Sequence, residues 1–186
     1  MSRQPVQTVI LCEDRQQECF VRRFLLERGV NRRSIRVQQS PRAKGAADQW
    51  VRESFPKELR AYRSKCNYLP NCLLVAVDAD VQTVQEKTKR LETECRNQGV
   101  PFRGSDERVA FIVPKRNIET WLAYLRGERC DESATYPRLE NESDCQPGVE
   151  RLAEMCRQGM LEESPPESLR LACGEFQRLV DLGVAF

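Results

Sequence analysis

One stretch decides the predicted fold: CLLVAVDAD, residues 72–80. The run Cys72–Val77 is entirely apolar, and a continuous apolar run of this length is typical of a strand that is buried on both faces. Strands of this kind belong to parallel sheets that helices cover on either side. Asp78 and Asp80 follow the run directly, so the predicted strand ends in two carboxylates.

Strand-like and helix-like segments alternate on both sides of this run. The predicted strands are Val6–Cys12, Ser34–Gln38, Cys72–Val77 and Val109–Val113. The predicted helices are Gln16–Arg28, Ala46–Lys65, Thr83–Gln98, a short helix after an N-cap at Asn117, Val149–Arg157 and Glu167–Leu182. Repeated strand–helix units of this kind predict an α/β fold of three layers, with a mainly parallel sheet of about four strands.

The pattern changes after Gly127, which predicts a boundary at that point. Residues 1–126 are expected to form the α/β domain. Residues 127–186 are expected to form an acidic loop, Glu128–Gly148, and then a C-terminal helical extension that packs on the domain. Within the helix 46–65, Pro56 lacks a backbone N–H, which predicts either a kink or the start of a second helical piece.

Histidine is absent from the 186 residues, and its absence excludes several classes of function. Ser-His-Asp and Cys-His catalysis and His-ligated zinc or iron all need an imidazole. The nine cysteines include no Cys-x-x-Cys pair, so the sequence gives little support to a zinc site. Their odd number, with no secretory signal before them, indicates reduced thiols in a cytoplasmic protein. Neither membrane insertion nor secretion is expected, because the sequence has no apolar stretch long enough to span a bilayer and no signal-peptide core at its start.

The net charge of +2 is unevenly distributed along the chain. Residues 1–72 carry 15 Lys and Arg against 7 Asp and Glu, residues 73–126 carry 9 against 8, and residues 127–186 carry 6 against 13. The first segment is therefore basic, at +8, and the last is acidic, at −7. This asymmetry indicates a polyanion-binding side on the first segment; ordinary mixing of charges on a folded surface is the alternative.

Acidic side chains follow three of the predicted strands. Glu13 follows the first strand, Asp78 and Asp80 follow the third, and Glu119 lies a helical turn beyond the fourth. Because ligands of an open parallel sheet bind outside the carboxyl ends of its strands, we expect these acids to converge on one edge. An Asp-x-Asp in extended chain also turns both carboxylates to the same side.

Crowded carboxylates predict a divalent cation, because like charges repel unless they are protonated, paired or neutralised. Oxygen ligands suit Mg²⁺ or Mn²⁺. The predicted metal ligands are Glu13, Asp78, Asp80 and Glu119, and Glu13 is also a candidate general base. For each acid alone, a solvated loop or a helix cap is the alternative interpretation.

Basic side chains near these acids are candidate phosphate ligands. Lys115 and Arg116 follow the fourth strand, and a cation beside a metal stabilises charge that develops on a reacting phosphate. Arg42 and Lys44 precede a helix N-terminus, which favours a bound phosphate. Lys115 is therefore a predicted catalytic residue together with the four acids. Arg42, Lys44 and Arg116 are predicted substrate-binding residues.

This pattern resembles the Toprim (topoisomerase–primase) domain family, in which an acid follows the first strand and Asp-x-Asp follows the third. The matching motifs are VILCE, residues 9–13, and Asp78-Ala79-Asp80. Small standalone proteins of bacterial defence loci, related to the overcoming-lysogenization-defect (OLD) nucleases, are the most similar branch. The similar stretches are EDRQQE (13–18), WVRE (50–53) and PKRNIETWL (114–122), within residues 6–126. One departure is Asp14, where most Toprim sequences have glycine.

The resemblance implies a Rossmann-like three-layer fold and Mg²⁺- or Mn²⁺-dependent cleavage of DNA or RNA, tRNA included. It also implies a role in anti-phage defence with an ABC- or AAA-type ATPase partner, and a homo-oligomer is compatible with it. Two other functions stay open. One is a non-catalytic Toprim-like interaction and signalling module, which the acidic last third favours. The other is a receiver-like phospho-switch, with residues 12–14, Asp78 and Lys115 around a phospho-acceptor pocket.

Overall fold

Four parallel strands form the sheet of the computed structural model, in the order β2-β1-β3-β4. The structure describes residues 5–41 and 45–185, and the statements below concern those residues. The strands are β1 (Gln7–Cys12), β2 (Ile35–Gln39), β3 (Asn71–Ala76) and β4 (Val109–Ile112). Each agrees with its predicted range to within one residue at either end, because a run of apolar side chains bounded by polar ones marks the length of a buried strand.

The register of the sheet aligns the carboxyl ends of the strands. Cys12 of β1 pairs with Gln39 of β2 and with Ala76 of β3, and Ala76 pairs with Ile112 of β4. Each of these residues is the last of its strand. The segments that follow all four strands therefore begin along one edge of the sheet.

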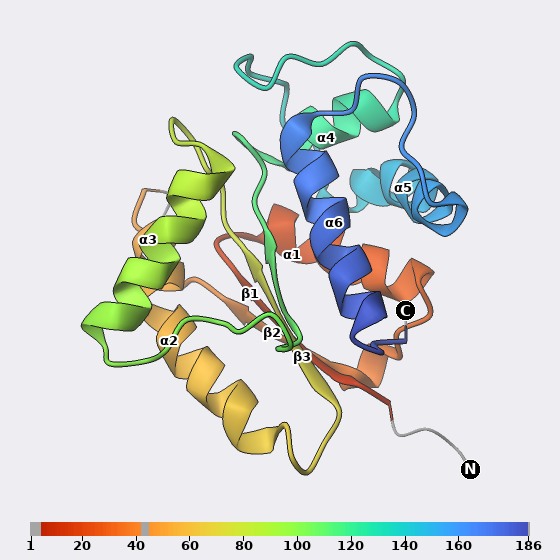
Figure 1. The fold of residues 1–186 in the computed structure, drawn as a ribbon. Helices are drawn as coiled ribbons and strands as arrows, with labels where there is room; N and C mark the ends of the chain where they lie inside the picture. The colour runs from red at the N-terminus through yellow and green to blue at the C-terminus, as the bar shows by residue number, and fades with distance from the viewer. Residues whose placement is uncertain (1–4, 42–44, 186) are drawn as a thin grey trace.

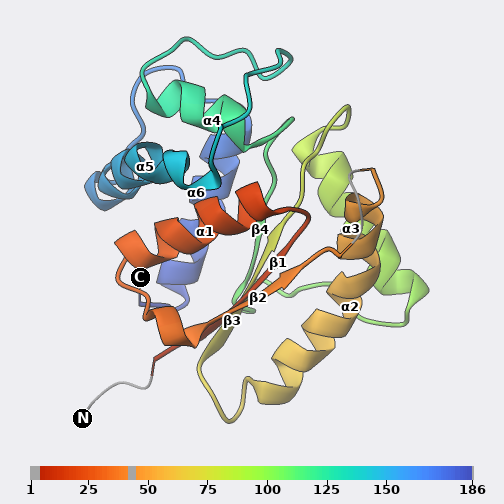
Figure 2. The same ribbon diagram turned by 180° about the vertical axis from the view of Figure 1, so that it is seen from behind.

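Helices cover both faces of the sheet, which gives three layers (Figures 1 and 2). Figure 1 shows α2 and α3 on one face, and α1, α4, α5 and α6 on the other. The helices are α1 (Arg15–Glu27), α2 (Ala47–Lys65), α3 (Val84–Asn97), α4 (Ile118–Leu125), α5 (Gln146–Gln158) and α6 (Glu167–Asp181). The predicted α/β class and the Rossmann-like three-layer arrangement with C-terminal helices are thereby confirmed.

Two apolar cores lie on the two faces of the sheet, and successive strand residues alternate between them. Leu74 of β3 packs in the core with α1, α4, α5 and α6, whereas Leu73 and Val75 pack in the core with α2 and α3. The first core includes Trp121, which is fully buried and whose Nε1 donates a hydrogen bond to Ser168 Oγ at 2.8 Å. Because both cores are apolar, the polar side chains that follow the strands lie at the edge of the sheet.

The backbone groups at the free edge of β4 bond to side chains rather than to another strand. The N–H of Phe111 donates to Glu175 of α6 at 2.9 Å. Arg103 and Arg178 both donate to the carbonyl of Val109, and Arg103 also pairs with Glu175. An unpaired strand edge is a template for aggregation, and this network blocks it. The end of α6 is thereby anchored to the sheet.

The long helix α2 differs from one of the two predictions for Pro56. It is a single helix from Ala47 to Lys65 with Pro56 inside it, so the prediction of a second helical piece is wrong. Val51, Phe55 and Leu59 of its inner face are fully buried. Burial of this apolar face offsets the loss of one helical hydrogen bond at the proline.

The acidic loop is shorter than predicted. A 3₁₀ turn, Glu142–Cys145, interrupts the predicted loop, and α5 begins at Gln146 instead of Val149. Pro147 lies in the first turn of α5. Proline is favoured there because the N–H groups of the first turn have no hydrogen-bond partner within the helix. Among the helices of residues 5–41 and 45–185, none combines the length and the apolar character that a bilayer crossing requires.

Candidate active site

The carboxyl edge of the sheet brings Glu13 and Asp78 together. They follow β1 and β3, which are neighbours in the sheet although 65 residues separate the two acids in the sequence. The backbone N–H of Asp78 donates a hydrogen bond to Oε1 of Glu13 at 2.6 Å. The chain order reverses at β1, which has β2 on one side and β3 on the other. Ligands of open α/β sheets bind at such a switch point.

A buried glutamine, Gln17, links the two acids. Its Nε2 donates to Oδ1 of Asp78 at 2.9 Å, and its Oε1 accepts the backbone N–H of Glu13 at 3.0 Å. Gln17 lies in the first turn of α1, and its own N–H donates to the N-cap residue Asp14 at 2.8 Å. Asp14 thus caps the start of α1. Gln17 was not a predicted site residue; as a glutamine three residues beyond an N-cap it has the spacing of a capping box.

Burial and repulsion raise the pKa of both acids. Burial is the main reason that the pKa of Glu13 rises to about 7; the N–H of Asp78 and the charge of Lys87 oppose the rise, and Asp48 and Asp80 add to it. Burial, followed by the charge of Glu13, raises the pKa of Asp78 well above its usual value. At neutral pH this pair therefore favours a bound proton or a bound cation over two free negative charges.

A buried lysine on α3 lies close enough to influence these acids. The side chain of Lys87 is 3% exposed, and its Nζ pairs with Oδ1 of Asp48 in the first turn of α2 at 2.8 Å. Thr83 and Glu86 form the capping box that begins α3 just before it. Sequence reasoning missed Lys87 and Asp48. The available signal was a lysine between Val84 and Leu91 on the apolar face of the helix, a position that a charge occupies only with a partner.

Asp80 departs from the expected geometry of the Asp-x-Asp motif. Its φ of 57° is left-handed, and its side chain is exposed. The chain turns here, with the N–H of Gln82 bonded to the carbonyl of Ala79 at 3.0 Å. The expectation that extended backbone turns Asp78 and Asp80 to the same side is therefore wrong. The charge of Asp80 still raises the pKa of both Glu13 and Asp78, so the three acids lie within electrostatic range of one another.

Glu119 lies in a different electrostatic environment. It is 6% exposed in the first turn of α4, and burial raises its pKa. The charge that raises this pKa further comes from Asp14, and neither Glu13 nor Asp78 contributes to it. Asp14 also raises the pKa of Asp78, so it lies within electrostatic range of both Glu119 and Asp78.

The predicted basic residues have separate environments. Nζ of Lys115 donates to the backbone carbonyl of Gln82, which joins the segment after β4 to the segment after β3. Arg116 is exposed beside it. Arg42 and Lys44, the other predicted substrate ligands, lie outside the described residues. Lys115 is thus bonded to a carbonyl and not to the Asp78 carboxylate that a phospho-acceptor pocket requires.

The donor set suits a magnesium ion with few protein ligands. Within residues 5–41 and 45–185, no group of three or more Cys, Asp or Glu side chains is arranged to hold a metal ion. Mg²⁺ is usually bound by one or two carboxylates, with waters and substrate phosphates in its other positions. Glu13 and Asp78 provide two carboxylates whose mutual repulsion such an ion relieves. Asp14, next to Glu13, and Asp80, two residues beyond Asp78, are exposed acids close to this pair in sequence.

Known proteins supply no independent identification of this site. The chain matches no protein-family model, no curated protein and no solved structure in these comparisons, so the Toprim resemblance has no support from them.

Proposed function

We propose that this protein is a Mg²⁺- or Mn²⁺-dependent nuclease that cleaves phosphodiester bonds in DNA or RNA. The observation that carries the proposal is the pair Glu13 and Asp78. Two acids from adjacent parallel strands meet at the switch point of the sheet, and each is held in place by hydrogen bonds although their charges repel. A fold maintains such an unfavourable arrangement more readily where a ligand offsets its cost.

The residues of the edge have distinct roles in this proposal. Glu13 and Asp78 hold the ion, and Gln17 fixes the carboxylate of Asp78 through its amide. A bound Mg²⁺ would supply a Lewis acid for a phosphoryl oxygen and would lower the pKa of its ligands. Where Glu13 is not a ligand, its pKa of about 7 suits a general base that takes a proton from water.

Positive charge near the acids supports a polyanionic substrate. Lys115 is half-buried at the edge and Arg116 beside it is exposed, so both are in reach of a phosphate that approaches the strand ends. The basic excess of residues 1–72 supplies a longer-range attraction that salt weakens. Lys87 is already paired with Asp48, so its role in the proposal is to moderate the repulsion among the acids.

The proposal covers an enzyme that acts alone and a nuclease subunit that works with an ATPase. The Toprim resemblance supports the second form, in cytoplasmic anti-phage defence. The non-catalytic module is the alternative that the test below can separate from both. The phospho-switch is not proposed further, because Lys115 is bonded to the Gln82 carbonyl.

Cleavage assays test the proposal directly. The purified chain is incubated with plasmid DNA, single-stranded DNA, messenger RNA and tRNA, with Mg²⁺, with Mn²⁺ or with EDTA. We expect cleavage that needs the metal and that falls by about 100-fold or more in Glu13→Gln and Asp78→Asn. Glu92→Gln is the matched control, because Glu92 is a partly exposed acid of α3 whose partner is Arg96 at 3.6 Å. Its activity is expected to equal that of the wild type.

Mn²⁺ binding provides a readout that needs no substrate. Electron paramagnetic resonance titration is expected to show one Mn²⁺ site that Asp78→Asn weakens and Glu92→Gln preserves. Equal Mn²⁺ affinity in all variants would refute the metal site. Mn²⁺ binding without cleavage of any nucleic acid, alone or with a copurifying ATPase, would favour the non-catalytic module.

A further inference from the structure

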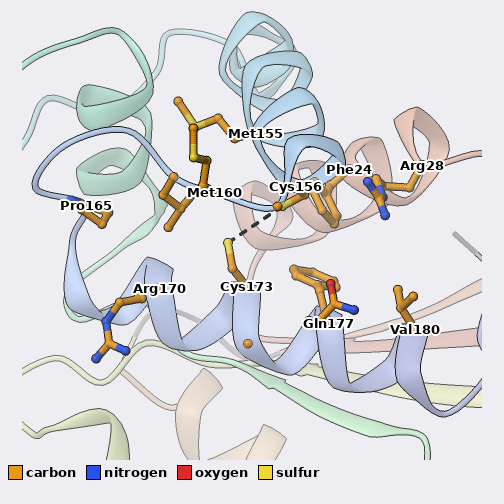
Figure 3. Close-up of a pocket in the computed structure, with 14 residues that line it drawn as sticks. Phe24, Arg28, Met155, Cys156, Met160, Pro165, Arg170, Cys173, Gln177 and Val180 are labelled. Carbon is orange, nitrogen blue, oxygen red and sulfur yellow. Dashed lines mark hydrogen bonds between the residues drawn. The ribbon is translucent and has the colours of Figure 1, made fainter.

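A second site lies between α1, α5 and α6, in a cavity of about 420 Å³ (Figure 3). Its lining is mainly apolar, with Phe24, Met160 and Val180 among the contributors, and none of the residues of the candidate active site takes part. Figure 3 shows the thiols of Cys156 and Cys173 pointing toward one another at this cavity. The site therefore combines an apolar enclosure with two nucleophilic side chains.

The two thiols are close enough to react with one another. Cys156 belongs to α5 and Cys173 to α6, and their Sγ atoms are 4.0 Å apart in a weak hydrogen bond. A disulfide needs a separation of about 2 Å, so the sulfurs must approach by about 2 Å. Rotation of the two half-buried side chains about χ1 is the least costly way to close this gap, because it moves no backbone.

We propose that Cys156 and Cys173 form a redox-active dithiol, in which a hydroperoxide oxidises Cys156 and Cys173 then closes a disulfide between α5 and α6. This inference is independent of the nuclease proposal. It assigns the cavity to a hydroperoxide, either hydrogen peroxide or an organic hydroperoxide whose apolar group fits the lining.

The disulfide forms in two steps, the oxidation of Cys156 and the attack of Cys173. The thiolate of Cys156 attacks the terminal oxygen of the hydroperoxide; an S–O bond forms, the O–O bond breaks, and water or an alcohol leaves with a proton from solvent. The thiolate of Cys173 then attacks Sγ of Cys156; the S–S bond forms, the S–O bond breaks, and hydroxide leaves as water with the proton of the Cys173 thiol. Two thiols are oxidised to one disulfide, and the hydroperoxide is reduced by two electrons.

The surroundings assign different roles to the two thiols. The hydrogen bond with Cys173 is the main cause of the lowered pKa of Cys156, and the positive charges of Arg28 and Arg157 add to this effect. The same hydrogen bond, together with burial, raises the pKa of Cys173. Arg28, which lines the cavity, and Arg157 both favour the thiolate of Cys156 by their positive charge, so Cys156 attacks first and Cys173 resolves the intermediate.

Another pair of neighbouring thiols in the described part of the chain serves as an internal comparison. Cys19 and Cys145 interact with one another, but they are only 6% and 0% exposed. A disulfide is therefore expected at Cys156 and Cys173 but not at Cys19 and Cys145.

Mass spectrometry of the full chain tests the proposal. The reduced protein is treated with hydrogen peroxide or with cumene hydroperoxide, the remaining thiols are blocked with iodoacetamide, and the protein is digested with trypsin. We expect the peptides 152–157 and 171–178 to be linked, with the loss of two hydrogen atoms, and dithiothreitol to reverse the link. Faster linking by cumene hydroperoxide would identify the organic hydroperoxide as the better ligand of the cavity.

Variants separate the two roles. Cys173→Ser is expected to accumulate a sulfenic acid at Cys156 that dimedone traps, whereas Cys156→Ser forms neither product. Cys66→Ser is the matched control, since Cys66 is exposed and lies outside the cavity, and it is expected to form the link at the wild-type rate. The proposal is overturned if the wild type gives no 152–157 to 171–178 link with either oxidant, if Cys19 and Cys145 link instead, or if oxidation yields only methionine sulfoxide.

Discussion

Glu13→Gln should make the metal-free protein more stable at neutral pH and should remove part of its pH dependence. A glutamine at this position keeps an oxygen that can accept the N–H of Asp78, which now lies 2.6 Å from Oε1 of Glu13. It cannot carry the negative charge that burial disfavours. The substitution therefore removes the cost of the charge while it preserves the shape and the hydrogen bond.

The size of the effect follows from the pKa of Glu13. A rise of this pKa from 4.5 to about 7 corresponds to about 3 kcal/mol of folding free energy, at about 1.4 kcal/mol for each tenfold change in proton affinity. Between these two pH values the folded chain keeps the proton that the unfolded chain has released. The stability of the wild type is therefore complete below pH 4.5 and falls as the pH rises toward 7.

Urea unfolding in EDTA at pH 5, 6, 7 and 8 measures this dependence. The excess stability of Glu13→Gln over the wild type is expected to grow from about 1 kcal/mol at pH 5 to about 3 kcal/mol at pH 8. Glu92→Gln, at a partly exposed acid, should show no such growth. An excess for Glu13→Gln that stays constant across this range would refute the argument that Glu13 is held in an unfavourable charged environment.

At pH 8, a high concentration of Mg²⁺ should make the wild type more stable than Glu13→Gln. An ion that binds only the folded wild type stabilises it by about 1.4 kcal/mol at ten times its dissociation constant and by about 4 kcal/mol at a thousand times. Only the higher concentration exceeds the excess of about 3 kcal/mol that Glu13→Gln has at pH 8. Glu13→Gln lacks one of the two proposed ligands, so Mg²⁺ should stabilise it only slightly. If Mg²⁺ stabilises both proteins equally at pH 8, Glu13 is not a ligand.

Two further substitutions test other parts of the structure. Lys87→Met leaves Asp48 without its partner and removes the positive charge near Glu13, so urea unfolding should show a loss of about 2 kcal/mol. Because the pKa of Glu13 rises further in the folded chain only, the fall in stability should still begin near pH 4.5 but should continue to a higher pH than in the wild type. Unchanged stability would mean that the buried pair contributes nothing. Glu175→Gln weakens the link between Arg103 and the β4 edge, so urea unfolding should show a loss of about 2 kcal/mol in the free energy of unfolding. Light scattering should show increased aggregation, because the edge is less well covered. A variant as stable as the wild type would show that α6 is held by apolar packing alone.

The strands and the position of the acids could be read from the sequence with little error. Apolar runs such as Cys72–Val77 have a length and a boundary that depend only on neighbouring residues, and β3 differs from this range by one residue at each end. Because parallel strands end at a common edge, Glu13 and Asp78 had to follow strand ends on the same side of the sheet. That they are adjacent depends on the strand order, which the sequence pattern did not specify.

The parts that sequence reasoning missed depend on contacts between distant segments. The sequence does not distinguish Lys87 from the other charged residues of α3. Its burial against Asp48 follows from the packing of α3 on α2. Gln17 bridges Glu13 and Asp78 only because β1 and β3 are neighbours. The electrostatic interaction of Glu119 with Asp14 has the same origin, since it depends on the packing of α4 against α1.

The sequence by itself determined the α/β class, the lengths of the strands and the presence of acids after β1 and β3. These features arise from local chemistry: apolar runs become buried strands, and polar residues end them. Tertiary structure alone decided which charges meet and that Cys156 and Cys173 lie 4.0 Å apart beside a cavity. Such proximities are set by the packing of helices on the sheet, and residues far apart in the chain carry no local signal of it.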